Sequence, residues 1–131
     1  MEVCRLRGVR NTRLMSITQL GTGSRIGIFD TVVMFGNNFG LFGSFKRARW
    51  LLQRFYSITR PNALILAEIL DPYKTTEHDH LAYHRFNRSR GRMGGQIRVR
   101  ILYRKYRSRW FYYLFVSEDE LRQILKGTGW K

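Results

Sequence analysis

Residues 63–70, ALILAEIL, constrain the fold more than any other segment of this chain. Because only Glu68 interrupts the run, an extended segment here is apolar on both faces, which is typical of a strand that helices cover in a parallel sheet. An earlier run, residues 29–35, has β-branched residues at its centre and predicts a second strand. We therefore expect an α/β fold with a mostly parallel sheet.

The segment between these two runs predicts the helix that a parallel connection needs. Residues 45–58 repeat their apolar positions at helical spacing, Ser44 precedes them as an N-cap, and Pro61 prevents the helix from continuing. Strand, helix and strand together have the length of a right-handed crossover unit within residues 31–70.

The second half of the chain predicts a C-terminal antiparallel hairpin. Apolar and basic residues alternate over residues 96–104, as in a half-buried strand, and residues 109–116 predict a second strand. Residues 105–108 are short enough to join the two strands. The remaining expected elements are a strand at 13–18, a helix at 76–90, a helix at 118–126 that Ser117 and Glu120 cap, and the start of a strand at 129–131.

Positive charge is concentrated in two segments. The chain has 24 Lys and Arg residues against 9 Asp and Glu residues, a formal net charge of +15. Residues 46–60 hold five basic and no acidic residues, and residues 85–110 hold ten and none. The second block interleaves arginines with aromatic residues and predicts contact with RNA or another nucleic acid through Arg98, Arg100 and Arg104. The alternative is that these arginines simply occupy the solvated face of a strand.

Several classes of protein are disfavoured by what the sequence lacks. The only cysteine, Cys4, cannot form an internal disulfide, and no apolar stretch approaches the roughly 20 residues that span a bilayer. Residues 1–10 contain no apolar region of the roughly 7 to 15 residues that a secretory signal requires. We therefore expect a soluble, cytoplasmic protein without a membrane partner.

Two motifs with chemical associations are better explained by ordinary structure. The glycines of GTGSRIG, residues 21–27, lead directly into a strand, whereas a phosphate-binding glycine loop precedes a helix. His78, His80 and His84 have no further histidine or cysteine near them to complete a metal site, so a solvated helix face is expected. No metal is predicted.

Polar residues follow both strands of the crossover unit. Gly36, Asn37 and Asn38 end the first strand, and Glu68 lies near the end of the second, shortly before Asp71 and Tyr73. Because ligands of open parallel sheets bind beyond the carboxyl ends of the strands, these positions predict a binding site. Asn and Gly are also ordinary turn formers, so a structural role is the alternative.

The order of these segments resembles the class I S-adenosylmethionine-dependent methyltransferases. RLMSITQL, FDTVVMFGNNFGLFG and ALILAEILDPY are similar to the family's third, fourth and fifth strands with their following loops. With the late hairpin and SEDELRQILKGTGW, the resemblance covers nearly the whole chain but only the later part of the family's domain. It implies a partial Rossmann-like sheet in a single domain, residues 1–131, that is truncated at both ends.

The resemblance also implies S-adenosylmethionine as the cofactor, with a methyl acceptor that it does not identify. Asn37 and Asn38 would line the reaction centre beside the transferred methyl group. The residues implied for cofactor binding are Ile17, Thr18 and Gln19 near the adenine and Gly36 near the methionine moiety.

Two diagnostic parts of the family's cofactor site, the glycine-rich loop and the ribose-binding acidic residue, would both precede Met1. The family's sheet order is three, two, one, four, five, seven, six, so the strand at 13–18 lacks its neighbours here. Exposed strand edges pair readily with a second copy, which makes a homo-oligomer an expected assembly. Three functions remain open: a methyltransferase, a basic nucleic-acid-binding module without catalysis, and a non-functional remnant.

Overall fold

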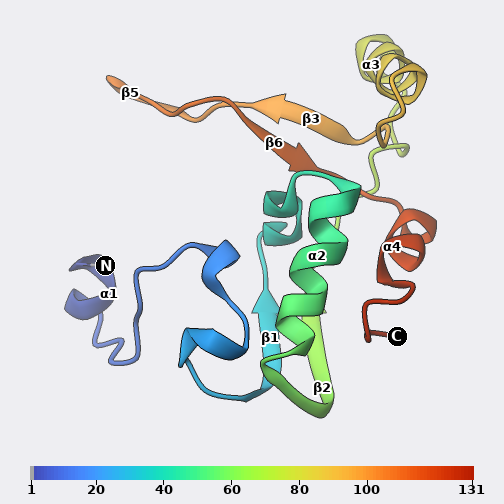
Figure 1. Ribbon diagram of the computed structural model, residues 1–131. Coiled ribbons are helices and arrows are strands. Elements are labelled where there is room, and N and C mark those ends of the chain that lie inside the picture. Colours follow the sequence, from blue (N-terminus) through green and yellow to red (C-terminus); the bar gives the residue numbers. More distant parts are fainter. Residues whose placement is uncertain (1) are drawn as a thin grey trace.

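The computed structural model describes residues 2–131, and its centre is a parallel strand–helix–strand unit. Strands β1 (Phe29–Met34) and β2 (Thr59–Ala67) pair in parallel, and helix α2 (Phe45–Tyr56) connects them (Figure 1). Val32 lies opposite Ile65 in the register. The predicted parallel α/β unit is confirmed.

Strand β2 begins earlier than the apolar run predicts. Phe29 pairs with Thr59, while Thr31 pairs with Leu64, so β2 holds extra residues between the two pairs and the register is irregular there. Asn62 adopts a left-handed φ of 69° within this stretch. Because no strand within residues 2–131 pairs with the outer edge of β2, Pro61 is tolerated although it has no N–H to donate.

Helix α2 buries one stripe against the β1–β2 pair, as its apolar spacing predicts. Ser44 caps the helix by accepting a hydrogen bond from the Arg47 backbone N–H at 3.4 Å. The core cluster joins this stripe to the short 3-10 helix η3 (Asn38–Phe42), to β1 and to residues near the C-terminus. Its buried members are Met34, Phe39, Phe42, Ala48, Leu51, Leu52, Phe55, Leu114, Val116 and Ile124.

Helix α4 (Glu118–Leu125) packs beside α2 and begins with the predicted capping box of Ser117 and Glu120. The strand start expected at 129–131 is wrong, because no strand forms at these residues. The Trp130 indole N–H instead donates to the Leu52 backbone carbonyl at 2.9 Å, which turns the end of the chain onto α2.

A long antiparallel ribbon, residues 96–114, extends away from this body, and we call it the arm (Figure 1). Strand β3 (Gln96–Val99) pairs with β6 (Phe111–Leu114), and β4 (Leu102–Tyr103) pairs with β5 (Tyr106–Arg107). The turn lies at residues 104–105 rather than 105–108, because Tyr103 pairs with Tyr106 and the returning strand is therefore paired before residue 109, its predicted start. Helix α3 (His78–Ser89) precedes the arm.

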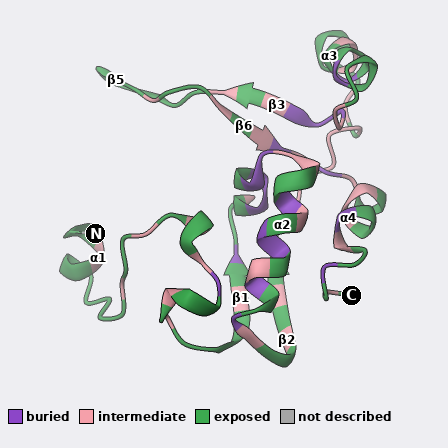
Figure 2. Ribbon diagram, in the orientation of Figure 1, coloured by how far each residue is buried: buried purple, intermediate pink, exposed green. Residues whose placement is uncertain are grey.

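The strand predicted at 13–18 is wrong. The 3-10 helix η1 (Ile17–Gln19) forms there, with Ser16 and Gln19 in a reciprocal capping box. Local hydrogen bonds satisfy this backbone because no described strand lies beside it to form a ladder. Upstream, helix α1 (Glu2–Leu6) buries no residue and stands apart from the body (Figure 2).

The two faces of the β1–β2 pair differ. Val32 and Ile65 pack toward the core below α2, whereas Val33, Leu64 and Leu66 are exposed on the opposite face. The prediction that helices cover both faces of the second strand is therefore wrong for the described chain, because only the side facing α2 has a covering layer.

Candidate functional site

The carboxyl ends of β1 and β2 meet at a polar loop. The Gly36 backbone N–H donates to the Glu68 carboxylate at 2.6 Å, which joins residues that are 32 positions apart. Gly36 and Asn37 have left-handed φ angles of 64° and 57°, so the chain turns sharply here before η3 begins. The parallel pairing thus brings together Gly36 and Glu68, two of the residues that the sequence predicts for a binding site at the strand ends.

The two asparagines of this loop differ in whether the side-chain amide is hydrogen-bonded. The Asn38 side-chain amide donates to the Phe35 carbonyl at 2.7 Å, so it stabilises the turn itself. The Asn37 side-chain amide makes no hydrogen bond to any of residues 2–131, and the residue is half-buried. Of the two residues predicted for the reaction centre, Asn37 therefore has the amide that is free to meet a ligand.

A residue that the sequence analysis missed, Tyr113 of β6, supports this loop. Its hydroxyl donates to the Asn37 backbone carbonyl, and burial raises the pKa of the Tyr113 phenol. The base of the arm also packs closely on η3, since a Cβ added at Gly40 would lie 2.2 Å from the Tyr113 ring. The small residues Gly40 and Gly43 in FGLFG were the available signal for such a close approach.

The residues predicted to lie near an adenine are occupied by contacts of their own. The Gln19 side-chain oxygen accepts from the Ser16 N–H at 2.7 Å, and the Thr18 and Ser16 hydroxyls lie 2.8 Å apart. Ile17 packs against the hydrophobic core. No hydrogen bond within residues 2–131 links this segment to the loop at Asn37.

Asp71 and Tyr73 belong to a separate cluster between α3 and α4. The Tyr73 N–H donates to Asp71 at 3.0 Å, and the Tyr73 hydroxyl donates to Glu120. Burial raises the pKa of Tyr73, and the hydrogen bond to Glu120 raises it further. These contacts connect elements rather than line the strand-end loop, so the structure favours a stabilising role for both residues.

His84 lies in the same cluster, with its ring 5.4 Å from the Tyr73 ring and its Nδ1 atom without a partner in the described chain. Burial lowers the pKa of His84, and the positive charge of Arg88 lowers it further. Within residues 2–131 no three His, Cys, Asp or Glu side chains gather as metal ligands.

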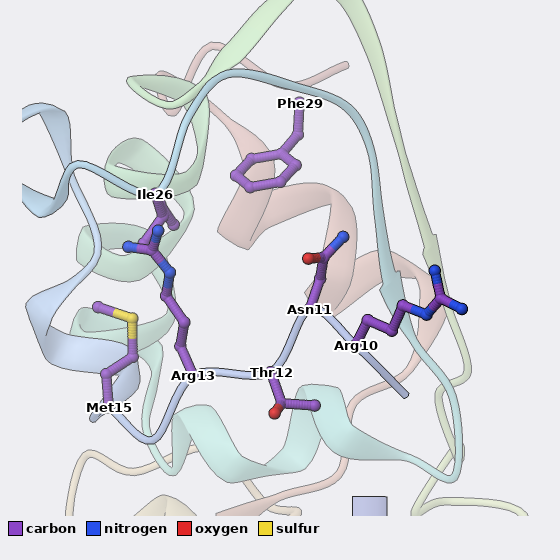
Figure 3. Close-up of a pocket in the computed structure, with 7 residues that line it drawn as sticks. All are labelled: Arg10, Asn11, Thr12, Arg13, Met15, Ile26 and Phe29. Carbon is purple, nitrogen blue, oxygen red and sulfur yellow. The ribbon is translucent and has the colours of Figure 1, made fainter. Parts of the chain in front are cut away.

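A cavity of about 510 Å³ is lined by none of the predicted site residues (Figure 3). Residues before η1 surround it together with the start of β1, at the edge of β1 that no described strand covers. Its lining residues are Arg10, Asn11, Thr12, Arg13, Met15, Ile26 and Phe29.

Two smaller hollows lie where the arm meets the body. One of about 430 Å³ is lined by Arg47 and by residues 110–112, and one of about 380 Å³ is lined by Lys46 and Arg92.

In the part of the chain that the structure describes, no helix has the length and apolar character needed to cross a membrane.

No model of a known protein family matches the sequence, and no curated protein does. Among solved structures, the chain is similar to a SAM-dependent methyltransferase from Bacteroides fragilis, crystallised in complex with S-adenosyl-L-homocysteine. The TM-score is 0.72 and the identity is 23%. The match covers 97% of this chain but 49% of that chain, so this chain spans about half the length of its neighbour. As the sequence resemblance implies, the chain has the fold of part of a class I methyltransferase domain.

Proposed function

We propose that this chain carries the reaction-centre side of an S-adenosylmethionine-dependent methyltransferase site, at the loop of residues 36–38. The observation that carries the proposal is the match of 97% of the chain to a methyltransferase crystallised with S-adenosyl-L-homocysteine. The loop supports it independently, because it lies at the carboxyl end of a parallel strand and offers the unpaired amide of Asn37.

The described residues fit only one side of this cofactor. Asn37 offers a free amide at the strand end, whereas the Gly36 N–H already has Glu68 as its partner, and Thr18 and Gln19 are engaged with Ser16. Glycines that lead into a helix N-terminus, which hold the methionine end in the family, have no counterpart at residues 21–27, where β1 follows. We therefore assign to this chain only the positioning of the reaction centre.

What the chain contributes to such a site is rigidity. Methyl transfer depends chiefly on the alignment of the nucleophile, the methyl carbon and the departing sulfur, so small displacements of the lining groups slow it strongly. The Asn37 carbonyl is held by Tyr113 from the arm, and the Gly36 N–H is held by Glu68, the residue that follows β2. Two separate elements thus fix the backbone on both sides of the free amide, as a precise site requires.

The decisive experiment is a calorimetric titration of the 131-residue chain with S-adenosylmethionine at low and moderate salt. Saturable one-to-one binding supports the proposal, and no binding by a chain that unfolds cooperatively contradicts it. A chain without a cooperative unfolding transition would instead favour a remnant.

A variant of Asn37 tests the site itself. Asn37→Gly removes the amide yet keeps the left-handed φ of 57°, which alanine would strain. We expect Asn37→Gly to weaken binding about tenfold or more, while Gln123→Ala, which removes an exposed amide on α4, leaves binding unchanged. Equal affinity of the two variants would remove Asn37 from the site.

A second function, nucleic-acid binding without catalysis, is favoured by residues 85–110, which contain ten basic residues and no acidic one. This function does not depend on cofactor binding.

A further inference from the structure

The two faces of the arm have different chemistry. Ile97, Val99 and Tyr113 are half-buried on one face. The opposite face, which we call the outer face, consists of the exposed residues Arg98, Arg100, Trp110 and Tyr112. Arg98 lies directly opposite Tyr112 in the β3–β6 register, so these side chains share one face.

On the outer face, arginines lie against aromatic rings. The guanidinium carbons of Arg100 and Arg98 are 4.9 and 5.6 Å from the centre of the Trp110 ring, and that of Arg92 is 5.5 Å from the centre of the Tyr112 ring. Trp110 nevertheless remains 51% exposed and Tyr112 41% exposed. Large planar surfaces thus stay open to a ligand beside fixed positive charges.

These charges have no acidic partner in the described chain. The three ion pairs within residues 2–131 involve Arg60, His78 and Arg122, none of which belongs to the arm. Residues 85–110 contain ten basic residues and no acidic one. A surface arranged only for stability would offset like charges with carboxylates, whereas an uncompensated cluster attracts an anionic partner.

The basic surface continues from the arm onto the body. Trp110 and Tyr112 line the 430 Å³ hollow together with Arg47 of α2, and the 380 Å³ hollow adds Lys46 and Arg92. Figure 1 shows the arm as a narrow ribbon that leads from its free tip to the start of α2. A flexible linear polyanion can follow such a path from end to end.

We propose that the outer face of the arm binds single-stranded RNA, with bases stacking on Trp110 and Tyr112 and phosphates pairing with the arginines beside them. Successive outer-face residues of a strand are about 7 Å apart, so each of the two rings takes a separate base. RNA satisfies both features of the surface. An anionic membrane or an acidic protein satisfies the charge but leaves the open rings without planar partners.

The proposal predicts saturable binding of the 131-residue chain to a fluorescein-labelled 20-nucleotide oligouridylate, measured by anisotropy over a series of salt concentrations. Trp110→Leu should weaken binding roughly 5- to 150-fold, the usual effect of losing one stacking platform. Because Trp110 lies outside the buried core, its replacement leaves the fold intact, which circular dichroism checks. Unchanged affinity of a folded Trp110→Leu variant overturns the proposal.

A matched pair of double variants separates the arm from net charge. Arg98→Ala/Arg100→Ala and Arg5→Ala/Arg7→Ala each remove two positive charges, the second pair from α1 and the residue after it. The arm variant should reduce the slope of log affinity against log salt by about 1.4, since each single-strand phosphate contact contributes about 0.7. The control should leave the slope unchanged, and equal slopes for the two variants overturn the assignment.

Two competitor ligands decide the class of partner. A 20-base-pair RNA duplex presents the same phosphates with its bases stacked inside, and phosphatidylserine vesicles present anionic charge without bases. We expect both to bind at least tenfold more weakly than the single strand. Equal binding by the duplex overturns base stacking, and tighter binding by the vesicles would make the arm a membrane-binding surface.

Discussion

The body around α2 and the arm use similar residue types in opposite ways. Phe42 in the body is 0% exposed, whereas Leu102 near the tip of the arm is 59% exposed. In the body, β1, β2, η3 and α4 all contribute contacts to α2 or its neighbours, so apolar side chains are buried by a second layer. The arm has only its own two strands over most of its length (Figure 2).

Whether the aromatic residues of an element stabilise the fold thus depends on the layer that covers the element, and not on the element's composition. A two-stranded ribbon cannot bury a core by itself. Replacing the exposed aromatic residues of the arm should therefore change the free energy of unfolding little, and their rings remain available for binding.

Phe42→Ala should cause the largest loss, because the Phe42 ring packs between those of Phe39 and Phe55 and leaves a cavity when removed. We expect the free energy of unfolding to fall by about 3–5 kcal/mol in urea denaturation followed by circular dichroism. Leu102→Ala on the arm should change it by no more than about 0.5 kcal/mol. Similar losses for both variants would mean that the arm is as much part of the core as η3.

Gly43→Ala tests the contact between the body and the base of the arm. Gly43 has a φ of 74°, and a Cβ there would lie 2.8 Å from the Tyr112 backbone oxygen, so the base of the arm must shift. We expect a loss of about 1–3 kcal/mol and faster protease cleavage within the arm. Gly23→Ala, where a Cβ meets nothing within 4 Å, is the control and should match the parent chain in protease resistance.

Tyr113→Phe removes one hydrogen bond from the same contact between the body and the arm, and it leaves the packing of the ring unchanged. Loss of the donor to the Asn37 carbonyl should lower the free energy of unfolding by about 0.5–1.5 kcal/mol. Tyr106→Phe, on the exposed tip of the arm, should have no measurable effect on stability. An equal effect of the two variants would show that the Tyr113 hydroxyl does not support the loop of residues 36–38.

His84 should give the smallest effect, a dependence of stability on pH. Its pKa is lowered in the folded chain by burial, Arg88 and His80, against the weaker opposing effect of Glu120, so the unfolded chain binds the proton more readily. Stability therefore falls as the pH drops below the unfolded value of about 6.5. The decrease in melting temperature between pH 7 and pH 5 should be smaller in His84→Gln than in the parent chain. The exposed His78→Gln control should retain the full decrease.

Much of the body could be predicted from local patterns. The β-branched run of β1, the apolar stripe of α2 and the capping box at Ser117 each encode an element through contacts within a few residues. The strand-end rule also selected Gly36 and Glu68, which the parallel register then joins through a hydrogen bond. These features were predictable because short-range chemistry and one long-range rule agree.

Other features depended on contacts between residues that are distant in sequence, which local patterns do not predict. Residues 13–18 have the composition of a strand, but no described strand lies beside them, and the Ser16 capping box forms instead. Tyr113 supports Asn37 only because the arm folds back onto η3, 76 residues away in sequence. The sequence also could not predict which of the two adjacent asparagines has a free side-chain amide, Asn37, and which has a hydrogen-bonded one, Asn38.

Adjacent residues encode the strand–helix–strand unit, the caps of α2 and α4 and the alternation of arginine with apolar residues on the arm, because each follows from local period and chemistry. Long-range packing, in contrast, determines which apolar faces are buried, where Trp130 docks and which asparagine has a free amide. Those outcomes depend on which surfaces meet, since a strand or a helix acquires a buried face only when another layer covers it.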